Sequence, residues 1–213
     1  MALLIHNAIS GFTQSQATWH GTIDLAEKLR ETHCDGVRSR VHYFRWCEDW
    51  DAVAAYHLSL AEQYRQKPTI GIYAYSWGAG WGAMQLAKQL RRRGLPVRVM
   101  VLSDPIYRHP IALWRSLRNA WLPIVGEPLI RVPDNVKEVF TFHHLQNRPS
   151  GHKLISASRT NGALIHPPQL LHYDHQYMDD APEFHRAALD QAARICAVAQ
   201  STTLEAIRRG QNP

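Results

Sequence analysis

Short apolar runs alternate with amphipathic stretches along most of this chain. Runs rich in β-branched, aromatic and aliphatic residues predict strands at 2–9, 37–46, 69–74, 97–102 and 136–143. Segments with apolar residues at helical spacing predict helices at 22–32, 49–66, 84–90 and 182–199. Strands that are separated by helices usually form a parallel sheet with helices on both faces. The pattern therefore predicts the α/β class.

A length of 213 residues fits one domain with a complete hydrophobic core. We expect residues 1–213 to form a single-domain three-layer sandwich, with a mostly parallel sheet between two layers of helices. The polar segment 147–168 is broken by proline and glycine, which predicts an irregular surface loop. The last dozen residues are predicted to fray.

A lid-like insertion is predicted at about 105–135, because this segment is too long for a plain connection between two strands. Its tryptophans are interleaved with arginines and prolines. Ile111, Trp114, Leu117 and Trp121 can share one face of a short amphipathic helix. Such a face either caps the domain core or covers an apolar substrate cleft, where it could also touch a membrane surface.

The composition is that of an ordinary globular protein, with 45% hydrophobic and 20% charged residues. No apolar run reaches the length of a membrane span, and no basic leader precedes the first apolar residues. Three scattered cysteines, Cys34, Cys47 and Cys196, lack the spacing of a metal site. We expect them to be free thiols in a reducing compartment, which makes a cytoplasmic location the default.

Charge and histidine content indicate no particular ligand. The formal net charge of +6 allows weak attraction to anionic surfaces but does not specify a nucleic acid, and none is expected as a partner. The run from His172 to His175 contains ligand-type side chains, but no second matched cluster accompanies it. No metal site is therefore predicted.

Ser76 stands at a sharp change from strand to helix, in the run TIGIYAYSWGAG over 69–80. Small residues lie two positions before and two after it, Ala74 and Gly78, which lets a strand and a helix approach closely. This is the sequence form of a nucleophile elbow, in which the serine Oγ is projected above the carboxyl edge of the sheet. The amide of Trp77 would then point to where an oxyanion forms.

The same stretch permits two other interpretations. Gly78, Gly80 and Ala83 fit a dinucleotide-binding fingerprint, and Asp104 supplies the expected acid about twenty residues later. Against this interpretation, bulky Trp77 would crowd a pyrophosphate, and two strand-helix units precede the motif. A glycine-rich helix start without function is the third interpretation.

A nucleophilic serine needs a base, and the base needs a group that orients it. Asp104 closes the strand that follows the elbow helix, at the sheet edge where Ser76 emerges, although a simple turn aspartate is an alternative. His175 lies just before a helix-start signal of carboxylates and a proline, which makes it the best candidate base. His172 is the alternative base.

Three pieces of the chain together resemble small α/β-hydrolase-fold proteins of the lipase/esterase type. They are the elbow Ala-Tyr-Ser-Trp-Gly, the strand end Ser-Asp-Pro, and the run 175–185 that leads into the last helix. The resemblance extends from about residue 3 to about residue 199. It implies the α/β-hydrolase fold and cleavage of a carboxylic ester or thioester through an acyl-enzyme, with Ser76, His175 and Asp104 as the catalytic triad and no cofactor.

The resemblance also suggests an oxyanion hole. If the loop after the first strand acts as the family's oxyanion loop, the amide of Phe12 joins that of Trp77. The chain departs from the family pattern in two ways: Ala74 replaces the first glycine of Gly-x-Ser-x-Gly, and no His-Gly pair follows the first strand.

The implied partner is a small-molecule or lipid-like acyl substrate, with weak membrane-surface contact through the Trp/Arg segment. The substrate lid would include Trp114, Leu117 and Trp121. Three other functions stay open: a dinucleotide-binding protein, a non-catalytic binding protein with this fold, and an acyltransferase that uses the same acyl-enzyme.

Overall fold

A parallel sheet forms the centre of the molecule. The computed structural model describes residues 2–12, 19–32, 34–106, 129–145, 151–158 and 160–208, the stretch 202–208 by its backbone alone. Within this part of the chain, seven strands pair in the order β2-β1-β3-β4-β6-β8, with β9 beside β6. Their pairings are all parallel. The strands are β1 (Ala2–Ser10), β2 (Val37–Arg45), β3 (Thr69–Tyr75), β4 (Val97–Ser103), β6 (Glu138–His144), β8 (Leu164–Ile165) and β9 (Gln169–Leu171).

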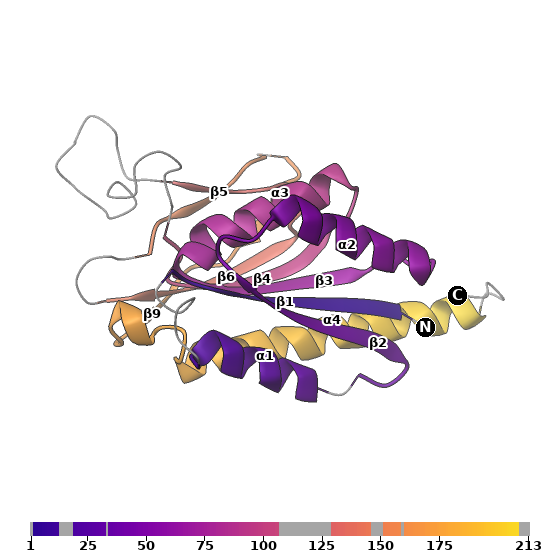
Figure 1. Ribbon diagram of the computed structural model, residues 1–213, viewed down its shortest axis with the longest axis horizontal. Coiled ribbons are helices and arrows are strands. Elements are labelled where there is room, and N and C mark those ends of the chain that lie inside the picture. The colour runs from indigo at the N-terminus through magenta and orange to yellow at the C-terminus, as the bar shows by residue number, and fades with distance from the viewer. Residues whose placement is uncertain are drawn as a thin grey trace.

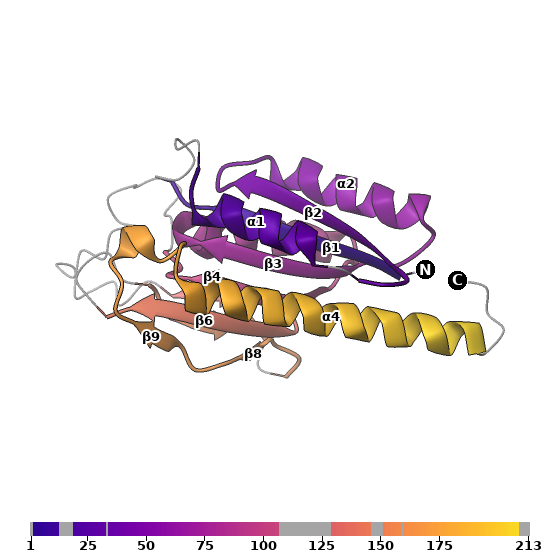
Figure 2. The ribbon, with the colours of Figure 1, turned by 90° about the horizontal axis from the view of Figure 1, so that it is seen from below.

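Helices cover both faces of this sheet. Helices α1 (Gly21–Glu31) and α4 (Pro182–Arg208) lie on one face, and α2 (Trp50–Gln63) and α3 (Ala83–Arg92) lie on the other (Figure 1, Figure 2). Each face has its own apolar core, the first with the α1 and α4 helices and the second with α2 and α3. The predicted single α/β domain with a mostly parallel sheet and helices on both faces is confirmed.

Burial along the strands follows from this layered arrangement. Strand β1, in the interior of the sheet, is buried from Leu3 to Ser10, whereas the edge strand β2 is mostly half-buried. A strand covered on both faces needs a nearly continuous apolar run, which is why β1 lacks alternation in its sequence.

Helix α2 starts where Asp49 caps it, because the carboxylate accepts hydrogen bonds of 3.1 Å from the amides of Asp51 and Ala52.

Two predictions about irregular segments were wrong in part. The stretch 147–168 contains β7 (Leu154–Ser156), which pairs with β5 (Ile130–Val132) in a second, two-stranded parallel sheet, and it also contains β8. At the carboxyl end, helix α4 continues to Arg208 instead of fraying after residue 201.

The predicted lid falls largely on 107–128, outside the described residues. Trp114, Leu117 and Trp121 therefore stay predicted lid residues. The described parts of the predicted insertion are residues 105–106, which follow β4, and residues 129–135, which contain β5.

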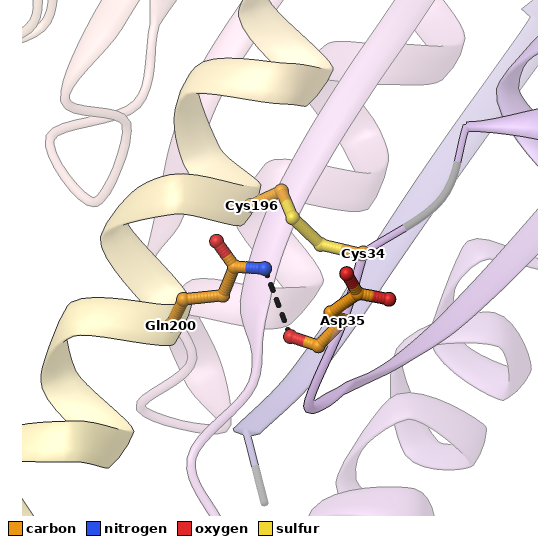
Figure 3. The surroundings of a disulfide bond; sticks show 4 residues. All are labelled: Cys34, Asp35, Cys196 and Gln200. Carbon is orange, nitrogen blue, oxygen red and sulfur yellow. Dashed lines mark hydrogen bonds between the residues drawn. A yellow bond between two sulfur atoms is a disulfide. The ribbon is translucent and has the colours of Figure 1, made fainter.

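The prediction of three free thiols was wrong for two of them. A disulfide joins Cys34, which precedes β2, to Cys196 on α4, with Cα atoms 6.0 Å apart (Figure 3). The Gln200 side chain supports the same contact, since its amide donates a 2.8 Å hydrogen bond to the carbonyl of Asp35 (Figure 3). Cys47 is free and exposed. The cytoplasmic expectation thus loses the support that it drew from unpaired cysteines.

No helix in the described part of the chain is both long enough and apolar enough to cross a membrane.

Candidate active site

Ser76 makes the turn between β3 and the following helix in a single residue. Its φ of 54° lies in the left-handed region, which a side chain with a Cβ seldom adopts. The turn is held by a 3.1 Å hydrogen bond from the amide of Ile106 to the carbonyl of Ser76. The helix then passes through a π-helical segment, η2 (Gly78–Gly82), before α3 begins. This is the backbone geometry that a nucleophile elbow requires.

The glycines after Ser76 admit two other pieces of backbone close to the elbow. A Cβ at Gly78 would lie 2.5 Å from the carbonyl oxygen of Ser10, at the end of β1. A Cβ at Gly80 would lie 2.0 Å from the carbonyl oxygen of Ile106, in the segment after β4. Neither distance is compatible with a side chain. Close backbone packing therefore accounts for both glycines without a bound nucleotide.

His175 is the histidine that the structure brings to Ser76. It begins the 3₁₀ turn η4 (His175–Tyr177), which follows β9 (Figure 1). Its Nε2 lies 3.0 Å from Ser76 Oγ, a distance suited to proton transfer. Tyr75 supports it twice, with a 2.6 Å hydrogen bond to the His175 carbonyl and a stacked ring whose centroid is 5.2 Å away. His172, the alternative base, is exposed on the same loop.

Asp104 binds the other nitrogen of this imidazole. Its Oδ2 contacts Nδ1 of His175 in a short hydrogen bond, and the aspartate side chain is fully buried. Its Oδ1 accepts a 2.8 Å hydrogen bond from the amide of Gly151. The φ of Asp104 is 44°, so both Ser76 and Asp104 are held in the left-handed region. The structure thus places all three predicted triad residues in one chain of contacts.

Sequence reasoning missed one neighbour of the acid. Nε2 of His144, at the carboxyl end of β6, lies 3.4 Å from Asp104 Oδ2. The sequence analysis assigned no role to this histidine. The signal was nevertheless present, since β4 and β6 are adjacent parallel strands whose carboxyl ends share one edge. On the residue before it, burial lowers the pKa of His143, and the nearby Asp104 carboxylate opposes this shift.

Asp104, His144 and His175 could also hold a metal ion, because each offers one ligand atom and these atoms lie within 4.8 Å of one another. Two imidazoles and one carboxylate are a recognised zinc ligand set with an open position. However, the same carboxylate already binds Nδ1 of His175. A metal taken up there would replace the proton on Nδ1 that a Ser-His-Asp triad needs. The absence of a metal cofactor stays a prediction.

Phe12 and Trp77 lie together on the other side of the nucleophile. Their ring centroids are 4.8 Å apart, and Trp46 completes the cluster at 5.1 Å from Trp77. This contact sets the loop after β1 beside the elbow, where an oxyanion loop would have to be. The roles of the Phe12 and Trp77 amides as oxyanion donors stay predictions.

Comparisons with protein families and with curated proteins found no match for this chain. Among solved structures, the chain is similar to RedJ, a thioesterase from the prodiginine biosynthetic pathway in Streptomyces coelicolor. The identity is 13% and the TM-score 0.45, over 90% of this chain and 85% of RedJ. RedJ with a PEG molecule bound in the active site gives 13% identity and a TM-score of 0.46, over 91% of this chain and 89% of that one.

ClbQ from the colibactin NRPS/PKS pathway is a third similar structure, at 11% identity and a TM-score of 0.43, over 93% of this chain and 99% of ClbQ. Similarity at this level does not identify an activity. The chemistry of this chain therefore has to be inferred from its own site.

Proposed function

We propose that this protein is a serine hydrolase that cleaves a carboxylic ester or thioester through an acyl-enzyme. The observation that supports this most strongly is the unbroken chain from Ser76 Oγ through His175 to the buried Asp104 carboxylate. A serine, an imidazole and an acid in this order form the hydrogen-bonded unit that activates an alcohol for attack on a carbonyl.

In the proposed reaction, Ser76 Oγ attacks the carbonyl carbon while Nε2 of His175 takes its proton. Asp104 keeps the other proton of the imidazole on Nδ1 and stabilises the imidazolium cation that forms. The amides of Trp77 and Phe12 bind the oxyanion. When the tetrahedral intermediate collapses, His175 protonates the departing alcohol or thiol. Water then attacks the acyl-enzyme by the same steps in reverse and releases the acid.

The substrate class that we propose is a small-molecule or lipid-like acyl compound. The aromatic cluster of Phe12, Trp46 and Trp77 beside the nucleophile suits an apolar group of this kind. We further propose that Trp114 and Trp121 belong to a lid over it.

A fluorophosphonate probe tests the nucleophile directly, since it reacts only with an activated serine. We expect the adduct on the peptide that contains Ser76, and we expect Ser76→Ala and His175→Ala to abolish it. Hydrolysis of p-nitrophenyl acetate and of a short acyl thioester should fall by at least about a thousandfold in both variants. Ser59→Ala, on the exposed surface of α2, is the matched serine control and should keep full labelling.

Two results would contradict the proposal. One is labelling that persists in Ser76→Ala, which would place the nucleophile elsewhere. The other is ester and thioester hydrolysis that is equal in wild type and Ser76→Ala. Product analysis in the presence of competing alcohols would reveal acyl transfer in place of hydrolysis.

A further inference from the structure

A second chain of acid, imidazole and hydroxyl groups lies near the proposed triad and takes no part in it. Nδ1 of His20 lies 3.7 Å from Oδ2 of Asp179. Nε2 of the same ring lies 3.0 Å from the hydroxyl of Tyr43. That hydroxyl donates a 3.0 Å hydrogen bond to Oγ of Ser10. Ser10, His20 and Asp179 are buried, and Tyr43 is half-buried.

This chain connects the two loops that flank the nucleophile. Asp179 lies between η4 and α4, on the segment that begins with His175. Ser10 is the last residue of β1 and directly precedes the loop that carries Phe12. Its carbonyl oxygen also lies against the elbow, where it excludes a side chain at Gly78. A displacement of Ser10 would therefore move the loop that should bind the oxyanion.

The acid end of the chain is firmly held. The amides of Gly21 and Thr22, in the first turn of α1, donate hydrogen bonds to the Asp179 carboxylate. A Cβ at Gly21 would lie 2.2 Å from the Asp179 carbonyl oxygen, so helix and turn are in direct contact. His185 on α4 binds the same carbonyl oxygen through Nε2 at 2.7 Å.

The position of one proton determines the direction of the hydrogen bonds. Because Tyr43 uses its only proton on Ser10, it must accept from an N–H at Nε2 of His20. A neutral His20 then turns the lone pair of Nδ1 toward Asp179 Oδ2 at 3.7 Å, where the two groups act on each other through charge and not through a hydrogen bond. A lone pair facing the carboxyl group favours its protonated form. A charged carboxylate favours the other tautomer, with the proton on Nδ1. Nε2 then becomes an acceptor, and the Tyr43 proton turns from Ser10 to His20. The Ser10 hydroxyl has to rotate and donate its own proton to the Tyr43 oxygen.

We propose that Asp179, His20 and Tyr43 form a positioning relay that holds Ser10, and with it the oxyanion loop, and that ionisation of Asp179 changes whether Ser10 accepts a hydrogen bond from Tyr43 or donates one to it. The effect on catalysis rests on the proposed hydrolase function, whereas the effect on the loop does not. The three residues are positioning residues, because none of them touches the reacting atoms.

The pair changes its protonation near neutral pH. Burial raises the pKa of Asp179 to about 7, and the neighbouring Asp180 adds to this shift, while the amides of the α1 first turn oppose it. Burial lowers the pKa of His20, and Asp180 opposes that shift. Tyr43 faces the pair from β2, and its own pKa is raised by burial.

His185 faces the pair from α4. Burial lowers its pKa, and from α1 Lys28 lowers it further while Asp24 opposes the shift. The hydrogen bond should therefore run from Tyr43 to Ser10 below pH 7 and from Ser10 to Tyr43 as the pH rises above about 7.

Tyr43→Phe removes the hydroxyl and leaves the ring in place. Amide hydrogen exchange in the peptide 8–12 should become about fivefold to tenfold faster, which is the effect of losing one hydrogen bond. For the ester substrate, kcat should fall about tenfold while KM changes less than about twofold, because the oxyanion exists only in the transition state. Ser10→Ala removes the acceptor and should reproduce both effects. The exposed Tyr56→Phe on α2 is the matched control.

Asp179→Asn tests whether the relay depends on ionisation of the Asp179 carboxyl group. Its side-chain amide can donate to Nδ1 of His20 at every pH and cannot ionise. Exchange in the peptide 8–12 should change between pH 6 and pH 8 in the wild type, beyond the intrinsic pH dependence of amide exchange, because the Ser10 side chain has to rotate. In Asp179→Asn this additional change should disappear.

Each outcome bears on the relay. Unchanged exchange in both Tyr43→Phe and Ser10→Ala would overturn it, whether or not the protein hydrolyses esters. If only one of them folds, that variant decides the result. The same pH-dependent exchange in Asp179→Asn as in wild type would overturn the proton dependence. If Ser76 proves unreactive while exchange responds as expected, the relay stands and the hydrolase proposal fails.

Discussion

The hydroxyl of Tyr75 donates a 2.6 Å hydrogen bond to the backbone carbonyl of His175. The residue just before the nucleophile thus holds the turn that carries the proposed base. The distance between Ser76 and His175 consequently depends on Tyr75, the last residue of β3, which contacts His175 across 100 positions of sequence. Removing this hydroxyl should affect catalysis without affecting the nucleophile itself.

Tyr75→Phe should lower kcat for an activated ester by about tenfold, since His175 would no longer be held at the distance that proton transfer needs. KM should change little, because the ring and the apolar surface remain. Steady-state kinetics and the rate of fluorophosphonate labelling check both statements. Tyr177→Phe changes an exposed tyrosine of the same turn and should have no effect. Equal kcat in Tyr75→Phe and wild type would mean that the turn is held by other contacts.

His144 offers a second test of the support around the acid. His144→Ala should reduce kcat by about fivefold, because Asp104 Oδ2 loses a neighbouring donor and is held only by the remaining contacts. His144→Gln places an amide nitrogen near the position of Nε2 and should restore most of the rate. A hydrogen-bonding role for His144 would be contradicted if kcat of His144→Ala equals that of the wild type. It would also be contradicted if kcat of His144→Gln is as low as that of His144→Ala.

The same variant tests the metal interpretation. Zn²⁺ added to the wild type should inhibit it, because Asp104, His144 and His175 can bind the ion at the expense of the triad. His144→Ala should be inhibited less. If a chelator instead abolishes wild-type activity and Zn²⁺ restores it, the cluster is a catalytic metal site and the triad mechanism is wrong.

Much of the fold could be predicted because long buried strands and amphipathic helices leave strong periodic patterns. Strand β4, for example, was predicted over 97–102 and is observed over Val97–Ser103. Strands β7 and β8 were missed, because they have three and two residues in a polar stretch and no period can be read from so few positions.

The proximity of Ser76 and Asp104 could be predicted because adjacent parallel strands bring their carboxyl ends to one edge of the sheet. Contacts that depend on how the helices pack could not be predicted from the sequence. Cys34 and Cys196 are 162 residues apart and meet only because α1 and α4 cover the same face of the sheet. Nothing in the local sequence of either cysteine indicates its partner.

Acid should destabilise the fold through His57. This side chain is fully buried on α2, and its Nε2 lies 2.7 Å from Asn7 Oδ1 on β1. Burial lowers the pKa of His57 from 6.5 to about 3. Between these values the unfolded chain binds a proton that the folded chain does not. The stability that depends on an uncharged His57 is therefore fully present above pH 6.5 and is lost as the pH falls toward 3.

Lowering the pH from 7 to 5 should cost about 2 kcal/mol of unfolding free energy through this one residue. His57→Gln keeps a donor for Asn7 and has no ionisable side chain at position 57. The free energy of unfolding, measured with urea, should therefore depend less on pH in this variant. His172→Gln, an exposed change, should leave the slope as it is in wild type. An unchanged slope in His57→Gln would show that other groups cause the acid sensitivity.

The disulfide between Cys34 and Cys196 determines how many cysteine thiols can react. Under denaturing conditions without reductant, one thiol, that of Cys47, should react, and reduction should raise the number to three. Replacing Cys34 and Cys196 by serine should lower the unfolding free energy by about 2–5 kcal/mol, because the bridge closes a long loop. Cys47→Ser should change it little. Three reactive thiols before reduction would restore the free-cysteine prediction.

Only three non-glycine residues of the described chain have positive φ, and two of them are Ser76 and Asp104, the third being Arg65. A left-handed conformation costs a residue with a Cβ about 1–2 kcal/mol. Glycine at Ser76 would remove this cost together with the proposed nucleophile, whereas glycine at Asp104 would also leave the Gly151 amide without its acceptor. The strained backbone at Ser76 and Asp104 is what the proposed reaction would require, and a protein selected for stability alone would have no need of it.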